Sequence, residues 1–146
     1  MITRICMLML GNMIDAQDAY LAVFEKLFIR LKKDPPEEAD KWLAKVAYNE
    51  CNSMLRFKRR HRFLSLDDIS EPFKNDEDIA FMELVFSLPE KYRNVLYLYY
   101  NKGYSTAEIA AITGKRENTV RTQLKRARDK LKRVLDERND ERSEPE

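Results

Sequence analysis

The sequence predicts an all-α protein of two small helical domains, a three-helix domain and a four-helix domain, joined by an acidic linker. Apolar residues recur every three to four positions in both halves, as expected for helices that bury one face. The 146 residues include only three glycines, and 36% are charged, which argues against a β-sandwich and against a phosphate-cradling glycine loop. An apolar content of 44% argues against wholesale disorder.

Residues 1–62 are predicted to form the three-helix domain. Its helices cover about residues 1–10, 15–31 and 38–57, with Asp15 as the cap of the second helix. Two consecutive prolines end that second helix, because proline cannot donate a backbone hydrogen bond. The side chains expected to be buried are Val23, Phe24, Leu27, Phe28 and Leu31 in the second helix, and Trp42, Leu43, Val46, Ala47, Cys51, Met54 and Leu55 in the third.

The charges are strongly segmented, although the net charge is only +2. Residues 1–62 carry 12 basic and 8 acidic side chains, residues 63–90 carry 1 and 8, and residues 91–135 carry 12 and 3. Periodicity is lost over residues 63–78, which we interpret as the acidic linker. Two basic blocks separated by an acidic one suggest two modules that face nucleic acid. Solvated surface charge is the alternative.

Residues 79–137 are predicted to form the four-helix domain, and residues 138–146 a charged, frayed tail. The first helix covers about residues 79–88. Pro89 opens the second at the first helical position, where its missing N–H costs nothing. That helix runs to a glycine-containing turn at about residues 101–103.

The last two helices have the signature of a helix-turn-helix. Ser105 and Glu108 stand at capping-box spacing, and Gly114 supplies a left-handed stop. Ala110 and Val120 have the spacing of the small crossing residue and the apolar anchor of that motif. The face opposite Val120 presents Asn118, Arg121, Thr122 and Lys125.

This face carries the side chains that read and hold duplex DNA. Asparagine can bond adenine bidentately and arginine can bond guanine, whereas further cations pair with phosphates. We place Lys115 and Arg116 in the turn near the DNA backbone, and Arg126 and Arg128 beside phosphates farther along the helix. The prediction is therefore double-stranded DNA binding, with this helix in the major groove. An antiparallel helical hairpin with a solvated basic face is the alternative.

The same residues resemble a known family. LPEKYR at residues 88–93, YSTAEIA at residues 104–110 and NTVRTQLKRAR at residues 118–128 are similar to the fourth region of bacterial sigma-70 factors, in the extracytoplasmic-function (ECF) group. DAQD at residues 15–18 resembles the polymerase-binding helix of that group. WLAKVAYN at residues 42–49 resembles its helix for reading and melting the −10 element.

The resemblance implies a dissociable polymerase subunit that directs transcription initiation, with core RNA polymerase and promoter DNA as partners and no cofactor. It assigns Asp15, Asp18 and Phe24 to polymerase binding, Asn49, Arg56, Arg59 and Arg60 to the −10 side, and Arg116, Asn118, Thr119, Arg121, Thr122 and Lys125 to the −35 side. An anti-sigma factor stays open as a further partner. For Phe24 and Trp42 we favour a core role over a binding role.

The first helix of the family is usually longer, and Met1 starts partway through it here. Either the true start lies upstream of Met1, or the face of Val23, Leu27 and Leu31 loses part of its covering helix. In the second case we expect the N-terminal domain to be the less stable one. The alternatives to a sigma factor are a helix-turn-helix regulator, or degenerate sigma-like protein, that does not engage polymerase, and a binding-only helical scaffold.

Other classes of protein have little support in the sequence. There is no nucleophile with a histidine base and no pair of carboxylates in an apolar setting, so we expect no enzyme. Cys6 and Cys51 lie among apolar neighbours outside any metal-ligand spacing, and we interpret them as buried free thiols. No apolar run approaches the length that spans a bilayer, so we expect a cytoplasmic protein without membrane insertion.

Overall fold

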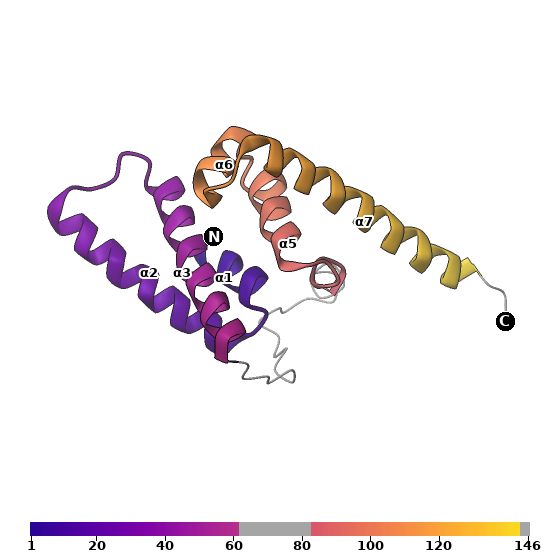
Figure 1. The fold of residues 1–146 in the computed structure, drawn as a ribbon, viewed down its shortest axis with the longest axis horizontal. Coiled ribbons are helices and arrows are strands. Elements are labelled where there is room, and N and C mark those ends of the chain that lie inside the picture. Colours follow the sequence, from indigo (N-terminus) through magenta and orange to yellow (C-terminus); the bar gives the residue numbers. More distant parts are fainter. Residues whose placement is uncertain (62–82, 144–146) are drawn as a thin grey trace.

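The computed structural model describes residues 1–61 and 83–143, and for residues 59–61 it describes the backbone alone (Figure 1). The helices are α1 (Ile2–Leu10), α2 (Met13–Lys33), α3 (Ala39–His61), α5 (Glu90–Leu96), η1 (Tyr97–Asn101), α6 (Thr106–Thr113) and α7 (Glu117–Ser143). Residues 83–86 are also helical. The described ranges contain no strand, which confirms the all-α prediction. The expected linker at residues 63–78 and the expected helix start at Ile79 lie outside these ranges.

Local signals bound the helices of the N-terminal half. α1 ends at Gly11, whose φ of 77° is the left-handed conformation that glycine adopts without strain. The cap of α2 is Asn12, whose side chain accepts a hydrogen bond from the Asp15 N–H at 2.9 Å. The prediction of Asp15 as the cap is wrong, because Asn12 has the extended backbone of a cap and Asp15 already lies in the first turn. α2 ends at Lys33, with Asp34 as its C-cap, before the two prolines, as predicted.

The apolar face of α2 is largely uncovered. Phe24, Phe28 and Leu31 are 54, 57 and 51% exposed, so the prediction that they are buried is wrong. The reason is helix length: at 1.5 Å per residue, the nine residues of α1 can cover only part of the 21 residues of α2. The buried residues of α2 are Ala16, Ala19 and Val23, all in its first half.

α3 packs against α1 through small side chains. Its buried residues are Ala44, Ala47, Tyr48 and Cys51, and the other residues of the predicted stripe are half-buried. Trp42 is one of these, with the Arg30 guanidinium 6.0 Å from its ring centroid. Cys51 and Cys6 of α1 are buried free thiols, as predicted, and they meet in space. A hydrogen bond with Cys6, together with burial, raises the pKa of the Cys51 thiol, so Cys51 stays protonated at neutral pH.

In the C-terminal half, α5 begins after Pro89 and continues into a stretch of π-helix. Pro89 is the N-cap of α5 rather than its first residue, since its ψ of 147° is extended. α5 passes into η1, a π-helical stretch in which the Lys102 N–H donates to the Tyr97 carbonyl at 3.2 Å. Sequence reasoning predicted a regular helix there.

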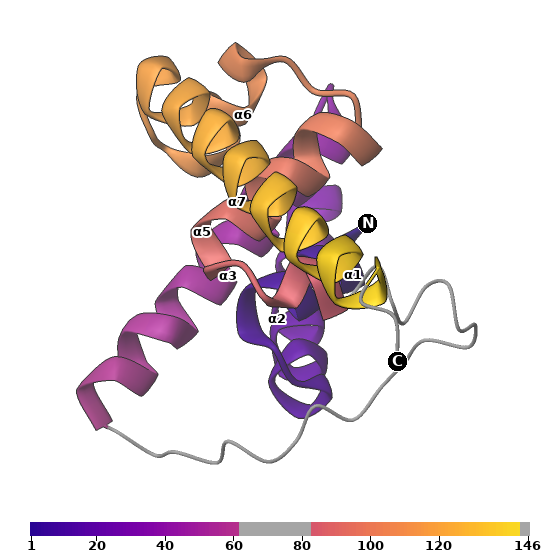
Figure 2. The ribbon, with the colours of Figure 1, turned by 90° about the vertical axis from the view of Figure 1, so that its right-hand side faces the viewer.

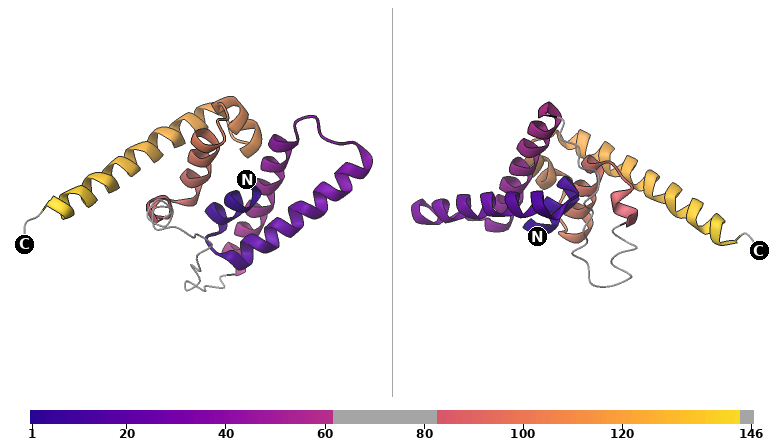
Figure 3. Two further views of the ribbon diagram at one scale, coloured as in Figure 1. Left: turned by 180° about the vertical axis from the view of Figure 1, so that it is seen from behind. Right: turned by 90° about the horizontal axis from the view of Figure 1, so that it is seen from below.

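α7 continues to Ser143, although the sequence analysis expected a frayed tail from residue 138. Residues 138–143 contain no glycine or proline, and Pro145 is the first residue that forbids helix. Figures 1 and 3 show the C-terminal part of α7 running away from the other helices.

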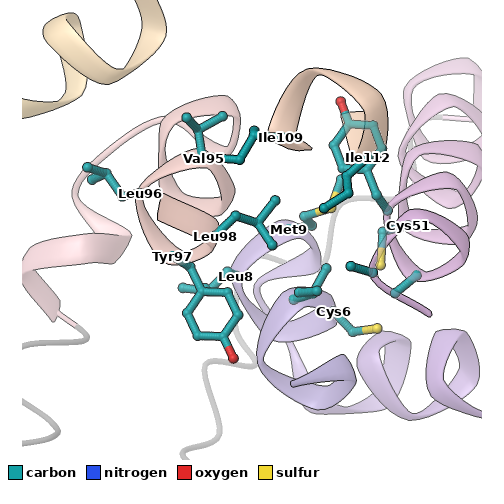
Figure 4. Close-up of a cluster of buried hydrophobic side chains, with 14 of the residues drawn as sticks. Cys6, Leu8, Met9, Cys51, Val95, Leu96, Tyr97, Leu98, Ile109 and Ile112 are labelled. Atoms are coloured by element: carbon teal, nitrogen blue, oxygen red, sulfur yellow. The ribbon is translucent and has the colours of Figure 1, made fainter. Parts of the chain in front are cut away.

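The two halves share one hydrophobic core. α1 packs on α5, and α3 packs on α6, so two pairs of helices join the halves (Figure 2). Figure 4 shows Leu8 and Met9 of α1 beside Leu98, Ile109 and Ile112 of the C-terminal half. The domain boundaries predicted from the sequence therefore separate parts that lie in direct contact.

Candidate nucleic-acid interface

α6, a turn and α7 form the predicted helix-turn-helix. Ser105 Oγ accepts from the Glu108 N–H at 3.1 Å, and the Glu108 carboxylate accepts from the Ser105 N–H at 3.4 Å, which confirms the capping box. Gly114 ends α6 at a φ of 68°. Val120 has no exposed surface and Leu124 is buried beside it, so α7 is anchored on α6 through the face that the sequence indicated. This leaves the opposite face of α7 open.

The open face is cationic and carries the residues predicted for the −35 side. Its exposed residues are Arg116, Asn118, Thr119, Arg121, Thr122, Lys125 and Arg126. The Glu117 carboxylate accepts from Thr106 Oγ1 of α6 at 2.8 Å and from the Arg121 guanidinium at 2.8 Å. Glu117 thus ties Arg121 to the body of the motif, near the helix N-terminus where base edges can be reached.

Unlike those residues, Arg128 contacts aromatic side chains of η1. Its Nε donates to Tyr100 Oη at 2.6 Å, and its guanidinium lies 5.6 and 5.7 Å from the ring centroids of Tyr99 and Tyr100. It is on the flank of α7 that faces η1, and part of its hydrogen-bonding capacity is used within the protein. Sequence reasoning missed this contact, which joins residues 28 positions apart.

Lys115, in the turn, faces protein in this arrangement. It is half-buried, and its Nζ lies 5.9 Å from the ring centroid of Tyr48 on α3. Burial and, secondarily, the nearby Lys91 charge lower its pKa. Its predicted place beside a DNA phosphate therefore requires that the turn move away from α3.

Two of the four residues predicted for the −10 side are described with their side chains. Asn49 and Arg56 are exposed on α3, and the Arg56 guanidinium donates to Ser53 Oγ at 3.4 Å. Arg59 and Arg60 continue the same helix, but their side chains lie outside the described part of the structure.

The three residues predicted for polymerase binding differ in their exposure and in their contacts within the protein. Asp15 accepts hydrogen bonds from Asn12 Nδ2, at 2.7 Å, and from Lys58 Nζ, so its carboxylate is engaged within the protein. Asp18 is exposed. Phe24 is exposed and stacks on Tyr20, with ring centroids 6.3 Å apart.

Phe24 belongs to a wider apolar surface that sequence reasoning missed. The large apolar side chains exposed on α2 are Ile14, Tyr20, Leu21, Phe24, Phe28, Ile29 and Leu31. We call this surface the α2 apolar face. The available signal was the density of apolar residues around the whole helix, which exceeds what one buried stripe needs. Contiguous exposed apolar surface of this kind marks protein or ligand contact sites.

Polar contacts join the two halves beside the shared core. Tyr104 Oη donates to the Asp40 carboxylate at 2.7 Å, and Lys41 Nζ lies 2.8 Å from the Glu108 carboxylate. Burial, followed by the Asp40 hydrogen bond, raises the pKa of Tyr104 to about 12, and the same hydrogen bond lowers the pKa of Asp40. The Lys41 hydrogen bond lowers the pKa of Glu108.

The described residues lack two further kinds of feature, a metal site and a membrane-spanning helix. They contain no group of three or more histidine, cysteine, aspartate or glutamate side chains that could hold a metal ion. None of the helices seen over residues 1–61 and 83–143 combines the length and apolarity that crossing a bilayer requires.

Known proteins resemble this chain in sequence and in fold. A family model described as sigma-70, region 4 matches residues 78–131. A probable RNA polymerase sigma factor, RfaY of Xanthomonas campestris pv. campestris, is 29% identical over an alignment 140 residues long that covers 86% of this chain and 34% of that protein. The ECF RNA polymerase sigma factor SigW of Bacillus subtilis is 25% identical over an alignment 154 residues long, gaps included, that covers 92% of this chain and 82% of SigW. The chain thus spans about a third of the first relative and about four fifths of the second.

Two solved structures share the fold. The sigma factor RpoE, in a complex with the anti-sigma factor NepR from Bartonella quintana, superposes with a TM-score of 0.76 at 18% identity, over 92% of this chain and 89% of that one. CnrH, in a complex with the cytosolic domain of CnrY, gives a TM-score of 0.62 at 24% identity, over 92% and 80%.

Proposed function

We propose that the chain is a sigma factor of the ECF group of the sigma-70 family, and that it directs promoter-specific transcription initiation by binding core RNA polymerase and promoter DNA. The observation that carries this proposal is the open cationic face of α7, on a helix-turn-helix whose cap, turn and anchor are all in place. An open arginine, asparagine and threonine surface at the start of such a helix suits the major groove.

Within that face we assign base reading to Asn118, Arg121 and Thr122. They lie in the first turns of α7, and Glu117 holds Arg121 in place. Phosphate contacts go to the surrounding cations, which are Lys115, Arg116, Lys125, Arg126 and Arg128, with Thr119 beside them. Arg128 ranks last among them because Tyr100 already binds its Nε.

Asn49, Arg56, Arg59 and Arg60 of α3 are proposed for the −10 side, and α2 for polymerase. On α2, exposure favours Asp18 and Phe24 over Asp15, whose carboxylate is occupied by Asn12 and Lys58. Phe24 belongs to the α2 apolar face, so we include the rest of that face in the proposed polymerase contact. Aromatic side chains on such a surface are typical of strong protein–protein contacts.

The packed arrangement of the halves conflicts with simultaneous reading of both promoter elements. The names of the elements place them about 25 base pairs apart, or roughly 85 Å of duplex at 3.4 Å per base pair. A compact chain of 146 residues has a radius of gyration of only about 15 Å. The halves must therefore part on the promoter. The 21 residues between the described ranges could reach roughly 70 Å when extended.

A DNA-binding regulator that does not engage polymerase is the second candidate. It is favoured by the engagement of Asp15 within the protein, which removes one predicted polymerase contact. Sigma factors are non-enzymatic regulators of transcription, and we propose that this chain likewise has no catalytic activity and acts in the cytoplasm, where polymerase and chromosome are.

Run-off transcription with purified core polymerase on a panel of promoters tests the proposal. We expect promoter-dependent transcripts from the full chain, and their loss in Arg121→Ala. Lys130→Ala is the matched control, because Lys130 is an exposed cation of α7 outside the assigned face. Binding to duplex DNA with neither co-purification with core polymerase nor transcript formation would establish the regulator instead.

A further inference from the structure

A cavity of about 360 Å³ lies where the two halves meet. α1 forms one wall, and the helical residues 83–86, α5, η1 and α7 form the others. Leu8, Leu96 and Leu131 belong to its lining, and Leu135 stands at its edge, still 46% exposed. A cavity of this size, with mostly apolar walls, has the dimensions of a small-molecule site.

Four cations line the same cavity: Arg4, Arg93, Arg128 and Lys132. No aspartate or glutamate occurs among the described residues that line it. An apolar cavity with cations and no carboxylate is complementary to a molecule with one apolar part and one anionic part, because arginine forks bind carboxylate and phosphate oxygens in pairs.

Two of these cations are held in fixed positions. The Arg93 guanidinium donates to the carbonyls of Leu88, at 2.7 Å, of Phe86, at 3.1 Å, and of Leu8, at 3.1 Å. Burial lowers its pKa, as expected for a cation largely removed from water. Arg128 is fixed by its hydrogen bond to Tyr100. Arg93 therefore serves the fold, and Arg128 is the head-group cation that the fold has already oriented, so that it loses little entropy on binding an anion.

We propose that this cavity binds a single-chain amphiphilic anion, with the apolar chain between α1, α5 and α7 and the carboxylate or phosphate head among Arg4, Arg128 and Lys132. α1 contributes Arg4 and Leu8, and the C-terminal half contributes the remaining walls. The ligand therefore bridges the halves and stabilises their packed arrangement, since a ligand favours the state that it binds better. This step rests on the proposed function: because the halves must part on the promoter, a ligand that holds them together inhibits transcription.

Isothermal titration of the full chain with dodecanoate, below the concentration at which it forms micelles, tests the binding. We expect one site, a dissociation constant at least tenfold lower than for dodecanol, and no binding of dodecyltrimethylammonium. Octanoate should bind at least tenfold more weakly than dodecanoate, because less apolar surface is buried. A dodecyl phosphate titration tells which head group the site prefers. Equal affinity for dodecanol and dodecanoate, or binding of the cationic amphiphile, would overturn the proposal.

Variants locate the site. Arg4→Gln combined with Lys132→Gln should weaken dodecanoate binding at least tenfold, whereas Lys130→Gln combined with Arg133→Gln removes the same charge outside the cavity and should change nothing. All four side chains are exposed, so we expect these substitutions to leave folding unchanged. Equal loss in both double variants would show general charge attraction and overturn the site. Binding of an acidic amphipathic peptide at this site, without binding of dodecanoate, would also overturn the proposal.

The regulatory step has a separate test. Dodecanoate should lower run-off transcription by the wild-type chain and affect the Arg4→Gln, Lys132→Gln variant at least tenfold less. Binding is measured without polymerase, so a chain that binds dodecanoate but starts no transcription contradicts the proposed function alone. A chain that transcribes and does not bind dodecanoate contradicts the ligand site alone.

Discussion

α2 and α7 are both long helices that bury only a short stretch of their length. α2 buries Ala16, Ala19 and Val23, and α7 buries Val120, Gln123, Leu124 and Ala127. What each helix leaves uncovered differs in chemistry: α2 exposes leucine, isoleucine and phenylalanine, whereas α7 up to Arg133 exposes mainly arginine and lysine. The first surface gains free energy by removing apolar area from water, and the second by releasing counterions from DNA. The two helices are thus suited to partners of different kinds.

The sharpest test of this contrast uses two neighbours on α2. Phe24→Ala should weaken binding to core polymerase by about 2 kcal/mol or more, as for an aromatic hot spot, and leave the melting temperature unchanged. Val23→Ala should do the reverse, because Val23 is fully buried and its truncation leaves a cavity. Pull-down titrations and thermal melts of both variants separate the effects. A lowered melting temperature in Phe24→Ala would mean that the α2 apolar face is structural.

On α7 the corresponding test compares Arg121 with Arg128. Arg121→Ala should cost about 1–3 kcal/mol on the preferred −35 duplex and little on a scrambled one, because a base contact is lost. Arg128→Ala should weaken both duplexes alike and reduce the salt slope by about 1 at most, since Tyr100 holds Arg128. Competition titrations at several salt concentrations measure both. If the two variants act identically, base reading is wrongly assigned to this face.

The shared core contains one polar side chain whose removal should stabilise the protein. Asn94 is 2% exposed, and neither atom of its side-chain amide has a hydrogen-bond partner among the residues of the described structure. Asn94→Leu should raise the free energy of unfolding by about 1 kcal/mol, since it ends the desolvation cost of an unpaired amide. Urea denaturation measures this, with Val95→Ala as the neighbouring control that should destabilise. A destabilised Asn94→Leu variant would indicate a partner that binds the amide in solution.

The smallest expected effect is a pH dependence of the contact between the halves. Asp40 and Glu108 have lowered pKa values, so their contribution is present above the unfolded-state values near 4 and is lost as the pH falls. Tyr104 has a raised pKa, so its contribution is present below pH 10 and is lost as the pH approaches 12. Thermal melts of wild type and Tyr104→Phe across pH test this. A high-pH loss that persists in Tyr104→Phe would assign it to other groups.

Sequence reasoning succeeded where structure depends on neighbouring residues. The capping box of Ser105 and Glu108 and the left-handed Gly114 are local features, and each was predicted in its place. The open face of α7 followed from the position of Val120, because helical periodicity fixes which side chains lie opposite.

It failed where the outcome depends on distant segments. Whether Phe28 is buried depends on how far α1 reaches along α2, and whether Lys115 is free depends on the packing of the turn against Tyr48. The pairing of Arg128 with Tyr100 and the meeting of Cys6 with Cys51 also join separate helices. Periodicity carries no information on such contacts.

The π-helical stretch η1 has a consequence for how the chain tolerates insertions and deletions. A turn closed between Lys102 and Tyr97 contains one residue more than an α-helical turn. Removing one residue within η1 would restore the α-helix and leave the direction of the chain nearly unchanged, whereas removing one residue from α5 would rotate everything that follows by about 100°. α6 would then leave in another direction and lose its place against α3. A length change is far better tolerated in the exposed connection between α2 and α3, because no helix orientation depends on its register.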